Sequence, residues 1–362
     1  MRTTKMPDFI TEKKSCWETL AETPLPIYIY GMGNGADKIL AAMEKYNTTP
    51  KGVFASDEFV RGHSFHGYKV QTLSQVEAEN EDFIIVLAFG AGYPSLYEKI
   101  REIASKHTLI APDVPVAGDG LFTYEYALTH AEEMQAVYDI LADDLSRKTY
   151  SDIINYKISG NTDYLHRCTS PMEEVWQNIL KPSPGEDFID MGAYTGDTAA
   201  EYARVTRGKY KRIFALEPDT RNYRKLTENT SDLANIHLFN AAAWNEDGTV
   251  YFTDRSGRNA AISPESHGES HTKPVTALRA DSITETADYI KMDVEGAEKQ
   301  AIEGADSIIR RGHCKLNIAC YHRNEDIFAL PLQVHALCPS LKLYIRHHMY
   351  IPGWDTNLYA VP

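Results

Sequence analysis

Cysteine is scarce in this sequence, and no two cysteines stand at the spacing of a metal or redox motif. The 362 residues include 5 cysteines, an odd number without a CxxC pair. This pattern argues against a disulfide framework and against a zinc cluster. It is typical of a protein kept in a reducing compartment, so we expect a cytoplasmic localisation and free thiols.

Long apolar runs and excess positive charge are also missing. No run of about 18 apolar residues occurs, which predicts that the chain has no membrane span. The first residues lack the apolar centre of a signal peptide. Lysine and arginine number 37 against 51 acidic residues, which gives a net charge of −14. Such a chain is poorly suited to non-specific binding of nucleic acid or of an anionic membrane.

The pattern of apolar residues predicts two α/β domains joined by helices. Short apolar strands alternate with helical segments over roughly residues 22–115, as in a small parallel α/β domain. Residues 116–180 instead carry apolar side chains at helical spacing. The turn-forming stretch Lys-Pro-Ser-Pro-Gly then precedes a second alternation of strands and helices. We therefore predict a Rossmann-like domain over 1–115, a helical connector over 116–180 and the main domain over 181–362.

The most informative stretch, Asp187–Thr198, is typical of a buried strand, a glycine turn and the start of a helix. Gly192 permits a sharp turn where a Cβ would clash. Gly196 permits a close approach to the helix. Asp197 or Thr198 is expected to cap the helix that follows. The free amides at that helix start form a site for a polar or anionic group.

Two acidic residues narrow the class of ligand that this turn is expected to bind. Asp190 stands two residues before the first glycine, so the pattern is Asp-x-Gly-x-x-x-Gly and not the dinucleotide pattern Gly-x-Gly-x-x-Gly. A carboxylate there repels a pyrophosphate but can hold an ammonium, and S-adenosylmethionine (SAM) carries an ammonium and a sulfonium but no phosphate. Glu217 ends the next strand, about 20 residues on, where a dinucleotide fold places its ribose-binding acid. We predict a SAM site; the alternative is a plain strand-turn-helix with a capping acid.

The expected cofactor-binding residues come from the strand ends and turns of this main domain. Small residues after the strand at 236–240 leave room for a flat adenine. The full predicted set is Asp190, Gly192, Ala193, Tyr194, Gly196, Asp197, Thr198, Glu217, Pro218, Asp219, Ala241 and Ala242.

A second informative stretch is Tyr289–Glu298, in which a strand ends at Asp293 and a helix opens near Gly296. The next strand, 315–321, leads directly into His322. In open α/β sheets, ligands bind beyond the carboxyl ends of the strands. We therefore expect these two side chains to converge on one crevice with the two acids of the first motif.

These residues resemble the FkbM family of SAM-dependent methyltransferases over roughly 181–362. The matching stretches are Asp190–Thr198, Glu217–Asp219, Lys291–Glu298 and Leu358–Ala360. The resemblance implies a class I methyltransferase sheet, which a terminal hairpin over 341–347 and 357–361 would complete. It also implies that Asp190 serves the methionine end of SAM and Glu217 its ribose. Members of the family commonly methylate hydroxyls of sugars or natural products.

Methylation of a hydroxyl needs a general base, because a sugar hydroxyl is a poor nucleophile at neutral pH. Asp293 and His322 are the candidates. Each has a structural alternative: Asp293 can pair with Lys291, and His322 can be a satisfied polar group. No Asn/Asp-Pro-Pro-Tyr motif follows the strand, which disfavours an amide nitrogen as acceptor. We therefore predict O-methylation of a sugar or glycan-type hydroxyl.

The first domain carries a second strand-glycine-helix unit with Gly31, Gly33 and Gly35, and Asp57 ends its next strand. These residues suit phosphate and ribose, but the Gly-x-Gly-x-Gly spacing departs from the dinucleotide pattern, so a structural turn is an equal alternative. The stretch 65–70 resembles the Gly-x-Pro-Val element of N-terminal domains in bacterial sugar acetyltransferases, with lysine in place of proline. Those domains hold a nucleotide-linked sugar, so a nucleotide-sugar is a possible ligand here.

Two other functions compete with methyl transfer. An oxidoreductase could bind NAD at the N-terminal glycines, but this leaves the run 291–298 without a role. A non-enzymatic sensor or scaffold could bind a nucleotide-sugar. We expect no metal site: His267 and His271 would bind metal only on a helix, and Pro264 and Gly268 disfavour one. The expected partner is a small-molecule or glycan acceptor.

Overall fold

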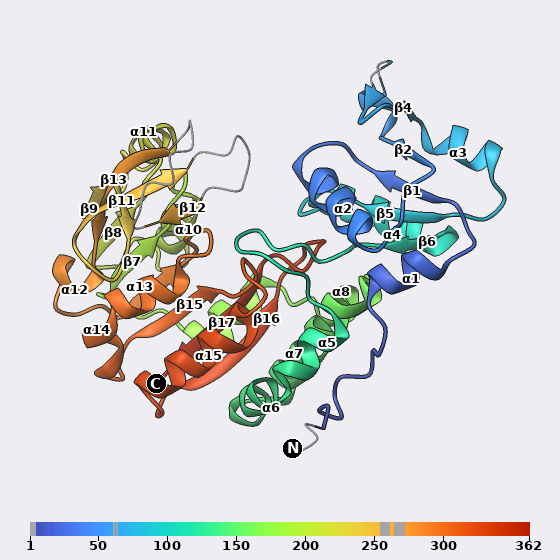
Figure 1. Cartoon of the computed structure of the whole chain (residues 1–362). Coiled ribbons are helices and arrows are strands. Elements are labelled where there is room, and N and C mark those ends of the chain that lie inside the picture. The colour runs from blue at the N-terminus through green and yellow to red at the C-terminus, as the bar shows by residue number, and fades with distance from the viewer. Residues whose placement is uncertain (1–4, 61, 63, 254–260, 264–271) are drawn as a thin grey trace.

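The structure is a computed structural model, and it describes residues 5–60, 62, 64–253, 261–263 and 272–362. Two α/β units lie at opposite ends, and helices together with a hairpin lie between them (Figure 1). Strands and helices alternate in both units, so the predicted α/β class is confirmed. The predicted histidine pair, His267 and His271, falls outside the described residues.

The first unit is a six-stranded sheet with the order β3-β4-β2-β1-β5-β6. Its strands are β1 (Ile27–Tyr30), β2 (Gly52–Phe54), β3 (Ser64–Phe65), β4 (Tyr68–Gln71), β5 (Ile84–Leu87) and β6 (Thr108–Ile110). Its helices are α1 (Cys16–Glu22), α2 (Asn34–Lys45), the 3-10 turn η1 (Asp57–Phe59), α3 (Leu73–Glu79) and α4 (Pro94–Lys106).

Helices cover both faces of this first sheet. Ile27 and Ile29 of β1 belong to the core that includes α1 and α2. Tyr28 and Tyr30 point the other way, into the core that includes Val76 of α3. A parallel strand buried on both faces reads as a continuous apolar run, which is why β1 and β5 lack polar alternation.

The second unit is a seven-stranded sheet with the order β16-β17-β15-β14-β7-β8-β9. Its strands are β7 (Asp187–Met191), β8 (Arg212–Leu216), β9 (Ile236–Phe239), β14 (Tyr289–Met292), β15 (Lys315–Ala319), β16 (Lys342–His347) and β17 (Thr356–Val361). Its helices are α10 (Asp197–Val205), α11 (Thr220–Asn229), α12 (Ala280–Ile283), α13 (Glu298–Gly304), α14 (Asp306–Arg310) and α15 (Asp326–Leu337). The last two strands pair antiparallel as the predicted terminal hairpin.

A smaller four-stranded sheet, in the order β10-β13-β11-β12, extends from the second unit. It consists of β10 (Ala241–Ala243), β11 (Gly248–Thr253), β12 (Ala261–Ser263) and β13 (Thr272–Leu278). The three alanines of β10 are buried. Small side chains in β10 therefore let the two sheets of this unit meet closely.

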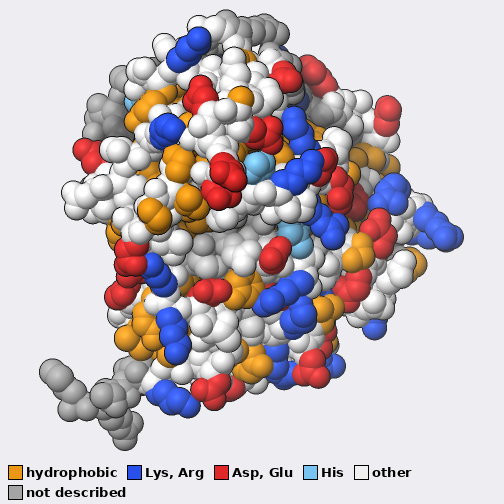
Figure 2. Space-filling view, turned by 90° about the vertical axis from the view of Figure 1, so that its right-hand side faces the viewer, with side chains coloured by type: hydrophobic (Ala, Val, Ile, Leu, Met, Phe, Trp, Pro, Cys, Tyr) orange, Lys and Arg blue, Asp and Glu red, His pale blue; other side chains and the backbone are white. Residues whose placement is uncertain are grey.

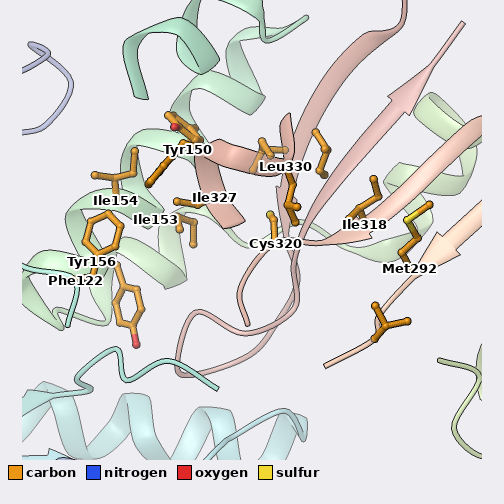
Figure 3. Close-up of a cluster of buried hydrophobic side chains, with 14 of the residues drawn as sticks. Phe122, Tyr150, Ile153, Ile154, Tyr156, Met292, Ile318, Cys320, Ile327 and Leu330 are labelled. Atoms are coloured by element: carbon orange, nitrogen blue, oxygen red, sulfur yellow. The ribbon is translucent and has the colours of Figure 1, made fainter. Parts of the chain in front are cut away.

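The connector is helical, and its core merges with that of the second unit. It contains α5 (Tyr124–Thr129), α6 (Ala131–Ile140), α7 (Asp144–Ser159), α8 (Asp163–Cys168), α9 (Met172–Glu174) and the π-helical turn η2 (Val175–Leu180). Tyr150, Ile153 and Ile154 of α7 lie in the same buried cluster as Ile318 of β15 and Ile327 of α15 (Figure 3). Burial of large apolar side chains therefore ties α7 to the second sheet.

The first unit contacts loops of the second. Ala91, in the loop after β5, forms an antiparallel bridge with Ile351 of the hairpin loop. A Cβ added at Gly90 or Gly92 would overlap the ring of Tyr350, so the two glycines admit that ring. In the segment after β6, the amide of residue 117 donates to the carbonyl of residue 322, 2.9 Å away. The first unit is thereby held against loops of the second sheet.

The state of the thiols and the distribution of surface charge can be compared with what the composition predicts. All five cysteines are free and buried. On the face shown in Figure 2, acidic and basic side chains are interspersed and do not separate into regions of one charge. Among the residues that the structure describes, none of the helices combines the length and apolar character needed to cross a membrane.

Candidate cofactor and acceptor site

Four parallel strands of the second sheet end side by side, in the order β15-β14-β7-β8. In this register Met191 of β7 pairs with Met292 of β14 and with Leu216 of β8. The next residues along the three strands therefore meet at one edge. The predicted residues lie at the ends of these four strands or just beyond them: Asp190, Glu217, Asp293 and His322.

Gly192 is required by the approach of two loops. Its φ is +80°, and a Cβ at this position would overlap the backbone carbonyl of Asp293. Its amide donates to the carbonyl of Leu216 at 3.0 Å. The glycine therefore lets the loops after β7 and β14 come together.

The start of α10 differs from the prediction. The helix begins at Asp197 with Gly196 as its N-cap, and no side chain forms a capping hydrogen bond. The expected cap by Asp197 or Thr198 is therefore wrong. Gly196 has φ +89°, and a Cβ there would lie 2.6 Å from Cγ2 of Thr230, so this glycine admits the end of α11.

Asp190 is fully buried, and neither of its carboxylate oxygens has a hydrogen-bond partner. The Nζ of Lys291 lies 3.5 Å from Asp190 Oδ1 but donates its hydrogen bond to the carbonyl of Gly192, at 2.9 Å. Burial raises the pKa of Asp190 to about 6. Burial alone lowers the pKa of Lys291, but the neighbouring carboxylates outweigh it, and that pKa is raised. At neutral pH the two groups therefore form a buried pair of opposite charge.

Glu217 joins the loops after β7 and β8. Its side chain accepts hydrogen bonds from the amides of Tyr194 and Asp219, both at 2.9 Å. The side chain of Asn240 donates to its backbone carbonyl at 2.8 Å. Burial of the carboxyl raises the pKa of Glu217 to about 7. This acid is thus fixed at the strand end, and near neutral pH it is divided between its two protonation states.

The other predicted cofactor residues differ in solvent exposure and in whether their side chains already form hydrogen bonds. Asp219 caps α11, because its Oδ1 accepts from the amides of Arg221 and Asn222, both at 2.9 Å. Tyr194 is 55% exposed and has a positive φ of 47°. Pro218 and Thr198 are half-buried and Asp197 is exposed, whereas Ala193, Ala241 and Ala242 are buried.

Asp293 is the more accessible of the two candidate bases, with a side chain that is 38% exposed. The hydroxyl of Tyr321 donates to its Oδ1 at 3.3 Å. Nε2 of His322 lies 3.4 Å from the same oxygen and 3.7 Å from Oε2 of Glu295. Lys291 Nζ lies 3.9 Å from Asp293 Oδ2, so this lysine stands between the two motif acids.

Glu298 is a site residue that the sequence did not single out. It is fully buried, and its Oε1 accepts from the amides of Val294 and Gly296, at 2.9 and 3.4 Å. The same oxygen lies 2.9 Å from Nδ1 of His322. Burial lowers the pKa of His322, but Glu298 and two further carboxylates outweigh this and raise it to about 10. The available signal was its place as the last acid of the Lys-x-Asp-x-Glu-Gly-x-Glu run.

The glycines of the first unit follow β1, a strand of the other large sheet, and packing explains two of them. A Cβ at Gly31 would lie 2.6 Å from the ring of Phe89, and one at Gly35 would overlap the carbonyl of Ala88. Gly33 faces open space. Asp57 is exposed at the start of η1. A nucleotide-sugar at this turn stays a prediction.

Comparisons with known proteins gave one family match and several similar structures. Residues 190–351 match the family model described as "Methyltransferase FkbM domain". The chain is similar to the crystal structure of methyltransferase FkbM from Methylobacillus flagellatus KT, with a TM-score of 0.72 and 19% sequence identity. This similarity covers 99% of the present chain and 94% of that one, so it includes the first unit. At this identity it shows a shared fold.

Weaker similarities concern about half of the chain. Aeropyrum pernix fibrillarin, solved with natively bound SAM, is 15% identical over 49% of this chain and 67% of its own, with a TM-score of 0.29. M. jannaschii TYW2, solved with AdoMet, is 18% identical over 52% of this chain and 74% of its own, with a TM-score of 0.30. A search of curated protein sequences gave no match.

Proposed function

Because residues 190–351 match the family model of the methyltransferase FkbM domain, we propose that the protein transfers a methyl group from SAM to a hydroxyl group. The acceptor class that we propose is a sugar or glycan. The five free and buried thiols support action in a reducing cytoplasm.

The observation that carries the SAM proposal is the buried carboxylate of Asp190, neither oxygen of which has a hydrogen-bond donor although Lys291 lies 3.5 Å away. A buried carboxylate without such donors is unfavourable, and the ammonium of SAM could donate hydrogen bonds to it. Glu217 fits the ribose, because a carboxylate oxygen can accept further hydrogen bonds while it holds the amides of Tyr194 and Asp219. Bound SAM would supply a methyl group that the sulfonium already activates for displacement.

The electrostatics supports Asp293 as the general base. With a pKa raised to about 10, His322 keeps its proton at neutral pH and is a poor acceptor for another. Asp293 is partly exposed and ends β14, next to the loop of the first motif. In this scheme Asp293 would accept the proton of the acceptor hydroxyl, and SAM would supply the methyl group as its carbon–sulfur bond breaks and the neutral thioether leaves. The ammonium of Lys291 lies 3.9 Å and Nε2 of His322 lies 3.4 Å from oxygens of that carboxylate.

Calorimetry of the full-length protein with SAM, NAD and UDP-sugars tests the cofactor. We expect saturable SAM binding and no NAD binding; NAD binding without SAM binding would overturn the proposal in favour of an oxidoreductase. Isotope-labelled SAM, incubated with a panel of glycans and followed by mass spectrometry, then tests the acceptor. Label on a nitrogen and not on an oxygen would refute the hydroxyl as acceptor.

A further inference from the structure

We propose that Asp293, Glu298 and His322 bind a divalent metal ion. Each of the three offers one ligand atom, and these atoms lie within 4.8 Å of one another. They come from the end of β14, the first residue of α13 and the segment after β15. No local motif indicated such a site, because none of the three residues is at a metal-motif spacing from another.

Two atoms of this cluster are buried without a hydrogen-bond partner, and this is what points to a ligand. One is Oε2 of Glu298, in a residue that is fully buried. The other is Nδ1 of His322, which lies 2.9 Å from Oε1 of Glu298 without the geometry of a hydrogen bond. A buried polar atom without a partner is unfavourable, and a cation beside both would satisfy them together, in place of the proton that His322 carries in the ion-free protein.

The distance between Nδ1 and Oε1 suits two ligands of a single ion. Two atoms bound at right angles, each about 2.1 Å from an octahedral ion, are roughly 3 Å apart. Oε1 of Glu298 also accepts hydrogen bonds from the amides of Val294 and Gly296, which fixes the carboxylate beside the imidazole, while Oε2 has no hydrogen-bond partner. The protein thus orients this ligand before any ion arrives.

Charge favours a cation here as well. Besides Asp293 and Glu298, the carboxylate of Glu295 lies 3.7 Å from Nε2 of His322. The neighbouring cations already have partners: Lys291 pairs with Asp190, and Nε of Arg323 donates to the carbonyl of Gly296 at 2.8 Å. Carboxylate and imidazole ligands without a thiolate suit first-row ions such as Mn²⁺, Fe²⁺ or Zn²⁺.

If the proposed methyl transfer is right, the ion has a role in it. A cation bound next to Asp293 would bind the acceptor hydroxyl and lower its pKa. The oxygen of Asp293 that does not bind the ion would then take the proton. This consequence rests on the proposed function, whereas the metal site itself does not.

Titration of the chelator-treated full-length protein with Mn²⁺ tests the site, with free Mn²⁺ followed by electron paramagnetic resonance. We expect saturable binding of one ion per chain and competition by Zn²⁺. Glu298→Gln and Asp293→Asn should each weaken binding by at least about 10-fold, as loss of a ligand or of its support does. The matched control is His107→Gln, which removes an imidazole that faces a single carboxylate, Glu77, at 3.0 Å. This control should bind Mn²⁺ like the wild type.

Asp293→Asn keeps the proposal testable if Glu298→Gln fails to fold, because Asp293 is partly exposed. Absence of saturable Mn²⁺ binding by the wild type would overturn the site, and so would unchanged binding by a folded Asp293→Asn variant. SAM calorimetry on the same sample separates this question from the enzyme's function. SAM binding without Mn²⁺ binding removes the metal site alone, and the reverse removes only the cofactor assignment.

Discussion

The side chain of Glu217 accepts hydrogen bonds from backbone amides in two loops, so the choice of substitution matters. Glu217→Gln keeps the size and one acceptor oxygen, whereas alanine would also release the amides of Tyr194 and Asp219. Each hydrogen bond to a charged group contributes about 1.5–3 kcal/mol. We therefore expect Glu217→Gln to weaken SAM binding by at least about 10-fold in calorimetry. An unchanged affinity in a folded variant would remove Glu217 from the ribose site.

The same carboxyl predicts how SAM binding depends on pH. Burial raises the pKa of Glu217 to about 7, so its proton is lost only near neutrality. The ionised form accepts hydrogen bonds from hydroxyls better than the neutral form does. We therefore expect the SAM affinity to fall as the pH decreases through about 7. Dissociation constants between about pH 6.5 and about pH 8 measure this, and Glu217→Gln should flatten the curve in that range.

Asp293 should matter for turnover and much less for SAM affinity. It ends β14 beside Lys291 and Tyr321, on the opposite side of β7 from Glu217. Asp293→Asn keeps the size and removes the basicity, and a lost general base costs about 10²–10⁴ in rate. Single-turnover assays with an identified acceptor check this. An equal loss of SAM affinity would make Asp293 a cofactor ligand, and full activity would exclude it as the base.

Glu298→Gln separates the two roles that we assign around Asp293. If the metal ion takes part in catalysis, this variant should lose turnover together with Mn²⁺ binding while it keeps Asp293 itself. If Asp293 acts without an ion, a folded Glu298→Gln variant should stay active.

At the scale of secondary-structure elements, the glycine turn after β7 connects sequence, packing and function. A side chain at Gly192 would overlap the carbonyl of Asp293 at φ +80°. We expect Gly192→Ala to destabilise the fold by at least about 2 kcal/mol, more than the strain of a left-handed residue alone. Gly185→Ala is the matched control, since Gly185 has φ +84° and open space around its Cβ position. Equal melting temperatures for the two variants would contradict this account.

The positions of β7, β8, β14 and the terminal hairpin were predictable, because buried apolar runs and turn residues are local signals. The start of α10 was not, because its cap is a backbone glycine and not a side chain. Glycine is required at position 192 because a Cβ there would overlap the carbonyl of Asp293, which lies 101 residues further along the chain. Glu298 likewise acquires its role only when β15 brings His322 beside it. Contacts of this kind depend on sheet order, which local patterns do not encode.

At the scale of the whole molecule, the predicted division at residue 181 can be tested against the packing. Tyr150, Ile153 and Ile154 of the connector are buried in one cluster with residues of β15 and α15 (Figure 3). Exposing a fully buried side chain of this size costs about 1.5–3 kcal/mol. A fragment of residues 181–362 would expose their partners, and native domains have only about 5–15 kcal/mol to lose.

We therefore expect residues 181–362 alone to lack a cooperative thermal transition and to be digested rapidly by protease. The matched fragment, residues 116–362, keeps the connector and loses only the first unit, whose contacts include the bridge between Ala91 and Ile351. It should melt cooperatively, with a lower midpoint than the full chain, because it also loses Asp113, whose carboxylate pairs with the buried ammonium of Lys157. Circular dichroism and limited proteolysis of both fragments measure the difference. If residues 181–362 melted cooperatively and bound SAM as tightly as the full chain, the connector would be a separate layer, and its shared core with the sheet would contribute little to stability.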